Sequence, residues 1–377
     1  FGNTTIRRKK TSKYPKISKI QNFLKSKTQN SQMLSILFTV QLLLLLSFTT
    51  EVTAFTVLSN SQQSSIRPFV GKSLYSTADD ASPETPPFCI PTTQTIASSL
   101  ESLRSSSKPI VIKYGGNAMT SPTLFASFCQ DIATLQSLGL KIVVVHGGGP
   151  QISSMLKRCN VQSEFASNGM RISSEEVVEI AEMVLCGSVN KDVSAGISNA
   201  GGRAIGISGR DSQLLQCTKL VGEDGLDVGL VGKVDHVNTE FLEGLLEMGL
   251  VPVVAPIGTG YNGDEGIAYN CNADVAAGRI AGELKADRVL FLTDIAGVCD
   301  PQKDMELIPA LDIAGVEGLI ADGTITGGMI PKVSYAVDAV KLGVKGAFIT
   351  DGRVPHAVLR EVLGGGSDGM GSGEGGT

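Results

Sequence analysis

The sequence predicts an α/β protein in three layers, with a mostly parallel central sheet and helices on both faces. From residue 109 onward, short β-branched apolar runs alternate with helix-length segments, which is typical of parallel sheets. Hydrophobic residues make up 42% of the chain but aromatic residues only 5%, with no Trp. The core must therefore be built mainly from Val, Ile, Leu and Ala. The 44 glycines allow close backbone approaches in the loops.

Six buried strands are predicted in chain order, at residues 110–112, 142–145, 204–207, 251–255, 289–292 and 346–349. The helices between them are predicted at residues 124–138, 151–157, 175–185, 189–199, 239–248, 273–281 and 332–342. A further helix can form before the first strand, at residues 96–107, where Ile96, Leu100 and Leu103 make one apolar stripe. In such a sheet, ligands bind beyond the carboxyl ends of the strands.

The chain ahead of this pattern is predicted to be targeting sequence. An apolar run in residues 34–48 ends at a small-residue cleavage pattern, and the stretch that follows is rich in Ser and contains no acidic residue up to Tyr75. This order resembles the bipartite plastid presequence of algae whose chloroplasts lie inside the endomembrane system, and plain secretion is the alternative. The expected segments are a non-native upstream extension (1–32), a signal peptide (33–54), a transit peptide and linker (55–90), the mature domain (91–363) and a flexible Gly-rich tail (364–377).

Charge and cysteine content exclude several classes of function. The net charge is −5, and residues 1–32 contain basic but no acidic residues, so the rest of the chain is more acidic still. A nucleic-acid-binding surface is therefore not expected. The seven cysteines form no CxxC pair and there are only three histidines, which argues against a disulfide framework and a structural zinc site.

Two glycine-rich loops follow predicted strands. The first is Lys113-Tyr114-Gly115-Gly116-Asn117, and the second runs from His146 through three glycines to Gln151. Successive glycines let backbone N–H groups converge on an anion, and a following helix adds its positive end. The chain contains no GxxxxGK[ST], and neither of these two loops fits GxGxxG, so the common nucleotide-binding motifs do not describe them. One such loop alone is usually a tight turn, but two with a Lys at a strand end predict a phosphate site.

Six blocks along residues 91–361 together resemble the acetylglutamate kinases, a branch of the amino-acid kinase family. They are Lys113-Tyr114-Gly115-Gly116-Asn117-Ala118-Met119, His146-Gly147-Gly148-Gly149-Pro150-Gln151-Ile152, Asn168-Gly169-Met170-Arg171, Asn270-Cys271-Asn272-Ala273-Asp274, Leu292-Thr293-Asp294-Ile295-Ala296-Gly297-Val298 and Gly327-Gly328-Met329-Ile330-Pro331-Lys332-Val333. The resemblance implies the fold of that family, with an N-terminal half that binds acetylglutamate and a C-terminal half that binds ATP.

The resemblance also implies the reaction, in which a phosphoryl group passes from MgATP to the γ-carboxylate of N-acetyl-L-glutamate, on the route to arginine. Because the nucleophile is already an anion, charge must be neutralised and no proton removed. On this resemblance Lys113 and Lys332 contact the transferring group and Asp274 holds the two lysines in place. His146 is then interpreted as a turn residue, and His236 and His356 as surface residues.

The remaining site residues are carried over from the same blocks. Arg171 is expected to grip the α-carboxylate as a two-pronged donor, and Asn270 to bind near the acetylated end. The other expected contacts are Gly147, Gly148 and Gly169 for the substrate, and Gly115, Gly116, Asp294, Gly297, Ile325 and Thr326 for ATP. Mg²⁺ is expected to arrive with the phosphates and to need no protein metal site.

Two features resemble the arginine-inhibited branch of the family. They are the helix at 96–107 and the segment 356–361, in which Glu361 is expected to bind the guanidinium of arginine; Arg210 is assigned to the same effector site. The branch implies a homohexamer made as a trimer of dimers, and a PII-type nitrogen sensor as a further partner. Arg210 stands where Lys is expected, and the Gly-rich tail departs from the apolar ending of the inhibited enzymes.

Two other interpretations remain open on the sequence. One is another amino-acid kinase, acting on carbamate, glutamate, aspartate or a uridylate. The other is a catalytically silent subunit that binds arginine or a PII-type sensor, although Lys113, Asp274 and Lys332 are all present. Neither a nucleic acid nor a membrane is expected as a partner of the mature protein.

Overall fold

The computed structural model describes residues 55–58, 93–166, 170–222, 225–295, 297–300, 306–308 and 310–364. All of them belong to the unit Glu51–Thr377. The predicted upstream extension and signal peptide lie outside the described residues, as do most of the predicted transit peptide and of the Gly-rich tail.

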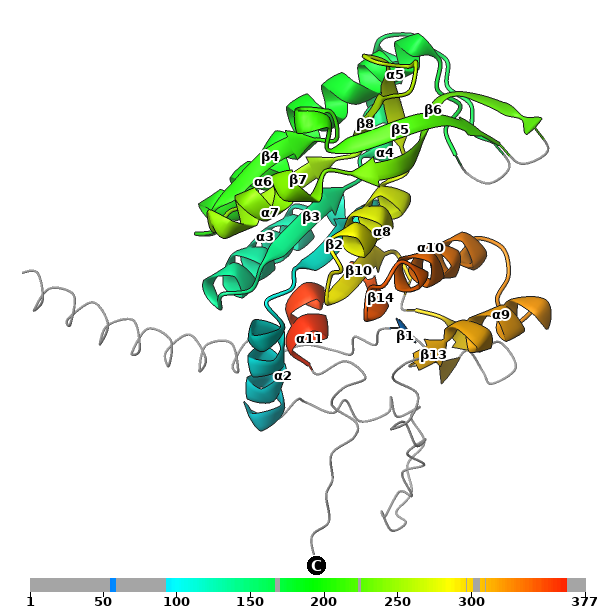
Figure 1. The fold of residues 1–377 in the computed structure, drawn as a ribbon. Coiled ribbons are helices and arrows are strands. Elements are labelled where there is room, and N and C mark those ends of the chain that lie inside the picture. The colour runs from blue at the N-terminus through cyan, green and yellow to red at the C-terminus, as the bar shows by residue number, and fades with distance from the viewer. Residues whose placement is uncertain are drawn as a thin grey trace, which may run out of the picture. The chain divides into compact units, whose positions relative to one another are not determined.

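The central sheet has eight strands (Figure 1). In spatial order they are β13 (Ala310–Asp312), β1 (Phe55–Leu58), β14 (Gly346–Asp351), β10 (Arg288–Thr293), β2 (Ile110–Tyr114), β3 (Ile142–His146), β7 (Val251–Ala255) and β4 (Ala204–Ser208). All six predicted strands are present, and neighbours from β14 to β4 pair in parallel. The predicted mostly parallel sheet is therefore confirmed.

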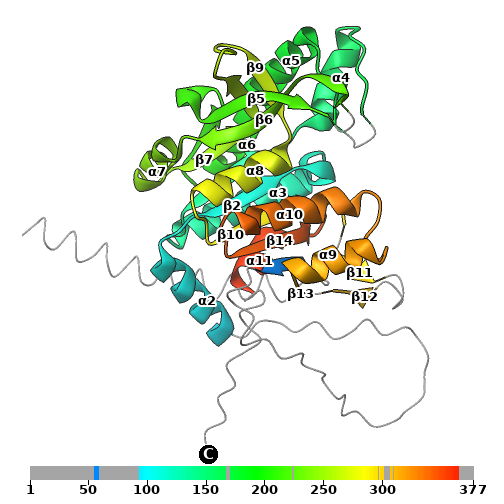
Figure 2. The ribbon, with the colours of Figure 1, turned by 45° about the vertical axis from the view of Figure 1, so that its right-hand side comes forward.

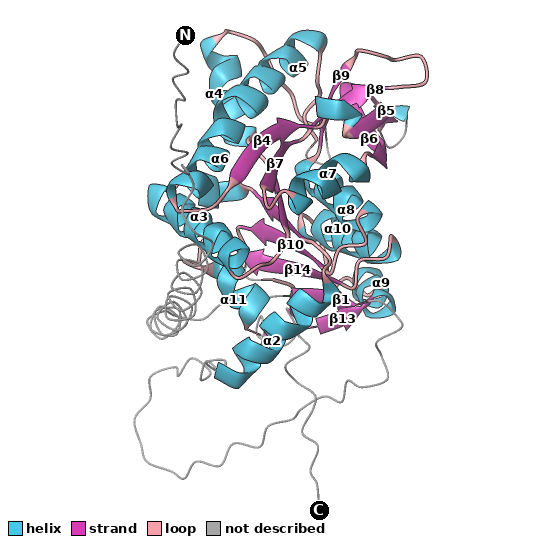
Figure 3. Ribbon diagram, turned by 60° about the vertical axis from the view of Figure 1, so that its left-hand side comes forward, coloured by secondary structure: helices cyan, strands magenta, loops and turns pink. Residues whose placement is uncertain are grey.

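Helices cover both faces of this sheet, which confirms the three predicted layers. Figure 3 shows one layer formed by α3 (Pro122–Ser137), α6 (Asn190–Asn199) and α11 (Ala357–Leu363). The opposite layer contains α7 (Thr239–Glu247), α8 (Ala273–Glu283) and α10 (Met329–Lys341). The middle strands are buried on both faces, as their continuous apolar runs require.

The helix starts follow from local sequence. Ser121 caps α3 by accepting a hydrogen bond from Leu124 N, and Pro122 occupies the first turn, where a missing N–H costs nothing. Asn272 Oδ1 caps α8 by accepting from the backbone N–H of Asp274 at 2.8 Å. Three further helices are α4 (Gly149–Arg158), α5 (Glu175–Glu182) and α9 (Ile313–Ala321).

A small closed barrel lies beside the sheet and was not predicted from the sequence (Figure 2). Its strands are β5 (Leu215–Val221), β6 (Asp227–Val237), β9 (Ala268–Cys271) and β8 (Ile257–Gly260). A two-stranded sheet, β11 (Cys299–Asp300) with β12 (Glu306–Leu307), was also missed. These strands are short or polar on one side, so their sequences lack the continuous apolar runs that marked the central strands.

The N-terminal helix α2 (Thr93–Ser106) is present as predicted. Its stripe is already covered within the chain, since Ile96 and Leu103 are 6% and 4% exposed and α2 packs against α11. Arg104 Nε also donates to Leu138 O at 2.6 Å, at the end of α3. Ile96 and Leu103 are therefore covered without a helix from a second subunit.

Strand β1 lies inside the segment predicted as transit peptide. It pairs in parallel with β13 and antiparallel with β14, between which it sits. A four-residue apolar run in a targeting segment carries no signal that separates strand from presequence. The sheet contact was thus not foreseeable from the local sequence.

No helix in the described part of the chain combines the length and the apolar character needed to span a bilayer.

Candidate active site at the carboxyl ends of the strands

The predicted site residues gather where the strand order reverses. β2 is followed along the chain by β3 on one side of it, whereas β10 and then β14 lie on the other. Crevices at such switch points are where open α/β sheets bind ligands. Lys113 is the penultimate residue of β2 and Asp294 directly follows β10, so both stand at this crevice.

Two lysines and two carboxylates form the centre of the site. Lys113 Nζ lies 3.2 Å from Asp274 Oδ1, with the two side chains 13% and 24% exposed. Lys332, in the first turn of α10, has its pKa lowered first by burial and then by the positive charge of Lys113. The carboxylates of Asp274 and Asp294 oppose that shift. The structure therefore brings together residues that lie more than 200 positions apart in the sequence.

The first glycine loop fits tightly under these charges. A Cβ on Gly115 would lie 2.8 Å from Lys113 Nζ, and one on Gly116 would lie 2.6 Å from Asp294 Oδ1. Gly116 also has a φ of +71°, which favours glycine. A side chain at either position would displace the lysine or the carboxylate from its place in the site, and at Gly116 it would also strain the backbone.

The second glycine loop lies against the first. Gly147 N donates to Tyr114 O at 2.8 Å, so this N–H points to the end of β2. Gly148 is the N-cap of α4, and a Cβ there would lie 2.5 Å from Leu185 Cδ2. The positive end of α4 begins at this loop, as an anion site needs.

Arg171 is buried beside the second loop, with 8% of its surface exposed. Its Nη1 donates to Ser163 Oγ at 2.5 Å, and its Nη2 to Ser153 Oγ at 2.8 Å and Gly149 O at 3.3 Å. The guanidinium also stacks 4.5 Å from the ring centroid of Phe165. These contacts fix the plane of the fork, and burial lowers the pKa of Arg171. The predicted neighbour Gly169 lies outside the described residues.

Asn270 reaches the same place from the barrel. Its Nδ2 donates to Ser173 Oγ at 3.2 Å, and Ser173 Oγ in turn donates to Arg171 O at 2.9 Å. One serine thus links the two residues predicted to hold opposite ends of the substrate. The structure brings Arg171 and Asn270 together although they lie far apart in the sequence.

The predicted nucleotide residues lie around the entry to α10. Thr326 is exposed, and its carbonyl accepts from Met329 N at 3.2 Å. Ile325 is only 2% exposed and belongs to the apolar core, so its backbone rather than its side chain faces any ligand. Gly297 lies in the loop that follows Asp294 and is buried.

Arg210 and Glu361 are far apart, so within one chain they do not form the single effector site that was expected. Arg210 follows β4 at one edge of the sheet and forms a bidentate pair with Glu182 at 2.7 and 2.9 Å. Glu361 packs near β14, where its Oε2 accepts from Thr350 Oγ1 at 3.1 Å. Five strand spacings of about 4.8 Å separate β4 from β14, or roughly 24 Å. Burial raises the pKa of Glu361 to about 7.

One histidine interpretation is corrected. His356 is half-buried rather than a free surface residue, because its Nδ1 lies 2.6 Å from Asp131 Oδ1. Its hydrogen bond to the buried Asp131 raises the pKa of His356. His236 is exposed, as predicted.

Sequence reasoning missed the side chains that support the site. Ser153 and Ser163 orient Arg171 and carry no local signal. Asn190 contacts His146 and could have been noticed, because it is a polar residue on the apolar face of a predicted helix. A polar residue at a core position usually marks a hydrogen-bonded network.

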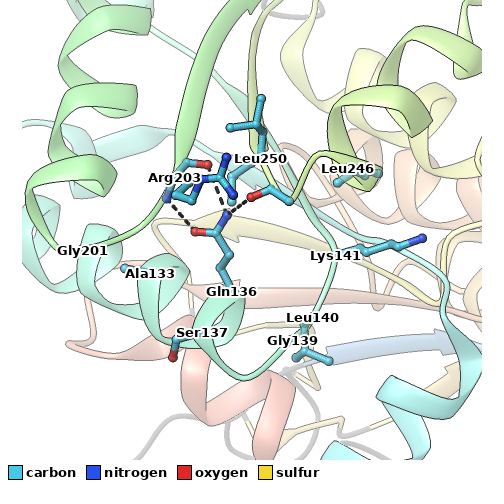
Figure 4. A pocket seen from close by; sticks show the side chains of 12 residues that line it. Ala133, Gln136, Ser137, Gly139, Leu140, Lys141, Gly201, Arg203, Leu246 and Leu250 are labelled. Atoms are coloured by element: carbon cyan, nitrogen blue, oxygen red, sulfur yellow. Dashed lines mark hydrogen bonds between the residues drawn. The ribbon is translucent and has the colours of Figure 1, made fainter. Parts of the chain in front are cut away.

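A pocket of about 410 Å³ lies elsewhere, at the amino ends of the strands (Figure 4). It is lined by residues that precede β3, β4 and β7, among them Lys141, Arg203 and Leu250. Gln136 lines it, donates a hydrogen bond to Gly249 O and accepts one from Arg203 N. Within the described residues there is no cluster of three or more His, Cys, Asp or Glu able to hold a metal ion.

Comparisons with known proteins identify the family of this chain. The sequence pattern of the amino acid kinase family matches residues 108–351. An acetylglutamate kinase from Acidiphilium cryptum is 51% identical over 67% of this chain and 86% of its own length. Another from Thiobacillus denitrificans is 50% identical, over 68% and 87%.

A solved structure shares the fold. The N-acetylglutamate synthase from Neisseria gonorrhoeae, complexed with coenzyme A and N-acetyl-glutamate, superposes with a TM-score of 0.62 at 22% identity, over 72% of this chain and 60% of that one. From the matched pattern and the two close relatives together, the chain belongs to the amino acid kinase family and, within it, to the acetylglutamate kinases.

Proposed function

We propose that the protein is an ATP-dependent kinase that phosphorylates the γ-carboxylate of N-acetyl-L-glutamate. The observation that carries this proposal is the pairing of Lys113 with Asp274 beside Lys332, between two glycine loops. It supplies positive charge where two anions must approach. Among the acids that this family phosphorylates, we choose acetylglutamate because these relatives are named acetylglutamate kinases.

The reaction follows from the charges of the site. A γ-carboxylate oxygen attacks the γ-phosphorus, a new O–P bond forms, and the bond to the bridging oxygen breaks with both electrons leaving on ADP. No proton needs to move, which suits a centre made of lysines and backbone N–H groups. Lys113 and Lys332 stabilise the phosphoryl oxygens and Asp274 keeps the lysines in register. Mg²⁺ enters as part of the substrate MgATP.

The acid is held by the other half of the site. Arg171 presents a fixed fork to the α-carboxylate, and Asn270 lies beside it through Ser173. The loops of Asp294, Gly297, Ile325 and Thr326 enclose the nucleotide. Gly115 and Gly116 approach its phosphates, where a side chain would collide with the charges already there.

An acceptor panel tests the function. ADP release is measured with N-acetylglutamate, glutamate, aspartate and carbamate, and the acyl phosphate is trapped with hydroxylamine as a hydroxamate. We expect turnover and hydroxamate with acetylglutamate only. Preference for another acid would show that the protein is a different kinase of the family. No turnover with any acid would support the interpretation as a silent regulatory subunit.

Regulation by arginine is a further part of the proposal. It rests on α2, which packs on α11, and on the buried carboxyl of Glu361 in α11. Arginine would bind through its guanidinium to Glu361, in a homohexamer of three dimers, with a PII-type nitrogen sensor as a further partner. Arg210 is not placed in this site.

We propose plastid import as the localisation. It rests on the apolar run at 34–48, followed by an acid-free, Ser-rich stretch. Reporter fusions test it in an alga whose plastid lies inside the endomembrane system: residues 33–90 should reach the stroma and residues 55–90 should remain outside the plastid. Secretion of the longer fusion would support plain export instead.

A further inference from the structure

His146 makes contacts at both ring nitrogens directly below the second glycine loop. It ends β3, is fully buried, and is followed by Gly147. Its Nδ1 lies 2.8 Å from Gly147 O, and its Nε2 lies 3.1 Å from Asn190 Nδ2. The proposed reaction uses no proton shuttle, so these contacts need a different explanation.

The contacts define which nitrogen carries the proton. A carbonyl oxygen only accepts, so the hydrogen lies on Nδ1 and is donated to Gly147 O. Asn190 is oriented by its own partners: its Oδ1 accepts from Lys191 Nζ, and the two hydrogens of its Nδ2 are shared among His146 Nε2, Ile207 O and Val253 O. Nε2 therefore accepts from the amide. Burial lowers the pKa of His146 to about 4, in agreement with a neutral ring.

Asn190 is held in turn by the sheet. A Cβ on Gly206 would collide with Asn190 Oδ1, so glycine at this point of β4 makes room for the amide. Asn190 begins α6 directly after a π-helical turn, Met183–Val189. Such turns insert one extra residue and change which side chain faces the sheet. The imidazole is thus fixed on its Nε2 side by β4 and β7 through Asn190, and on its Nδ1 side by Gly147 O of its own loop.

The bond to Gly147 O has a consequence for the next peptide. The described peptide bonds are trans, and in a trans peptide the N–H points opposite to the C=O. If the carbonyl of Gly147 points down to the buried imidazole, the N–H of Gly148 points up, away from the core. Gly147 N–H is directed to Tyr114 O, so the Gly148 N–H is the donor of this pair that faces the crevice.

We propose that His146 is a positioning residue for phosphoryl transfer. Its Nδ1–H holds the Gly147 carbonyl against the core, so that the Gly148 N–H is aimed at the oxygens of the transferring phosphoryl group. This inference rests on the proposed function, because it assigns the aimed donor to that reaction. An aimed N–H acts mainly in the transition state, so its loss lowers kcat more than it raises KM.

Two substitutions separate positioning from packing. In His146→Asn the amide nitrogen takes the place of Nδ1 and keeps the bond to Gly147 O. In His146→Gln the amide oxygen Oε1 reaches the place of Nε2 and keeps only the contact with Asn190. We expect His146→Asn to stay within about threefold of the wild-type kcat, and His146→Gln to lose roughly 10- to 100-fold with both KM values nearly unchanged.

His236→Gln, at an exposed histidine, is the matched control and should behave as the wild type. The reverse order of the two His146 variants, equal activity in both, or a loss seen only in KM would overturn the proposal. The wild type is first assayed on the acceptor panel, and the variants are compared on the acid that it uses. If the wild type does not turn over acetylglutamate, the proposed function is wrong. If only the order of activity of the two His146 variants differs from the expected one, the positioning role of His146 is wrong.

A measurement on the wild type stands even where a variant does not fold. The chain has three histidines, so ¹⁵N-labelled imidazoles can be assigned by comparison with His236→Gln and by their exposure. We expect a neutral His146 with its proton on Nδ1 between about pH 6 and 8. A proton on Nε2, or a ring that titrates in that range, would contradict the hydrogen bond on which the proposal depends.

Discussion

At the scale of single residues, the site is built from charges that need one another. Lys113 and Lys332 would repel in isolation, and the pKa of Lys332 is lowered by burial and by that repulsion. Asp274 lies within ion-pair distance of Lys113 and also favours the charged form of Lys332. The arrangement keeps two ammonium groups close enough to bind one phosphoryl group.

Replacing Lys332 by Ala removes one of these charges at the point of transfer. We expect kcat to fall about 10²-fold or more, since a lost transition-state donor costs about 2.7–4 kcal/mol. Steady-state kinetics and circular dichroism measure the effect. Lys341→Ala, at an exposed lysine in the last turn of the same helix, is the control. Near-normal turnover of Lys332→Ala would refute its assignment.

Changing Arg171 to Lys keeps the charge and loses the fork. The guanidinium is held by two serine hydroxyls and by Gly149 O, a geometry that a single ammonium cannot reproduce. The KM for acetylglutamate should rise much more than the KM for ATP. Arg158→Lys, exposed at the end of α4, should change neither. Equal increases for both substrates in Arg171→Lys would argue against a role at the acid.

At the scale of elements, α11 is fastened to the helix layer by one charged contact. His356 precedes α11, and its ring is paired with Asp131 of α3, which is 1% exposed. The backbone N–H of Leu359 also donates to Asp131 Oδ2 at 3.3 Å. The position of α11 therefore depends on a group that titrates.

This contact predicts a pH-dependent stability. The pKa of His356 is raised by its bond to Asp131, so the stabilisation is complete below about pH 6.5 and is lost as the pH rises through the raised pKa. We expect His356→Gln to lose about 2 kcal/mol of unfolding free energy at pH 6 and less at pH 9. Urea unfolding of both proteins across this range measures the difference.

Taking the difference between the two proteins removes the titrating groups that do not contact His356; the buried Asp131, whose pKa burial raises and His356 lowers, is tested together with it. Because the pKa of Glu361 is raised to about 7, this group also lowers the stability of the protein as the pH rises. The lowered pKa of His146 has the opposite effect. His236→Gln serves as the exposed control. A difference that does not change with pH would show that His356 is not charged in the folded protein.

Helix α2 carries the prediction for regulation. Removing residues before Lys108 takes away α2, which packs on α11, and also β1, which pairs with β14. The truncated protein should therefore be less stable by a few kcal/mol, at about 1.5–3 kcal/mol for each buried side chain such as Ile96 and Leu103. It should keep its turnover and lose its response to arginine. Light scattering with an arginine titration tests this. A full-length protein that is dimeric, or a truncated one still inhibited, would show that α2 does not carry regulation.

At the scale of the whole molecule, the catalytic residues and β1 lie in different parts of the sheet. Lys113, Asp274 and Lys332 come from β2, α8 and α10, whereas β1 sits between β14 and β13. A cut after the predicted transit peptide would remove β1 and leave the edge of β14 without that partner. The targeting proposal therefore requires residues 55–58 to be removed, whereas the sheet requires them to stay.

Two truncated proteins decide between them. We expect residues 91–364 to turn over with the kcat of residues 55–364, because the site is retained, but to unfold at a lower temperature, because β14 loses its antiparallel neighbour. Calorimetry and kinetics compare the two. An inactive shorter protein would show that β1 is part of the working domain, and N-terminal sequencing of the native enzyme would then be expected to find a start at or before Phe55.

The sequence by itself determined the six core strands, the helices between them and the glycine loops at their ends. These features are local: continuous apolar runs, caps such as Asn272 and paired glycines act over a few residues, so they can be recognised without the fold. The tertiary structure decided what these residues face. It alone brought Lys332 to Lys113, joined Asn270 to Arg171 through Ser173, covered the stripe of α2 with α11, and separated Arg210 from Glu361. Those relations depend on strand order, which brings distant segments together and which no local pattern records.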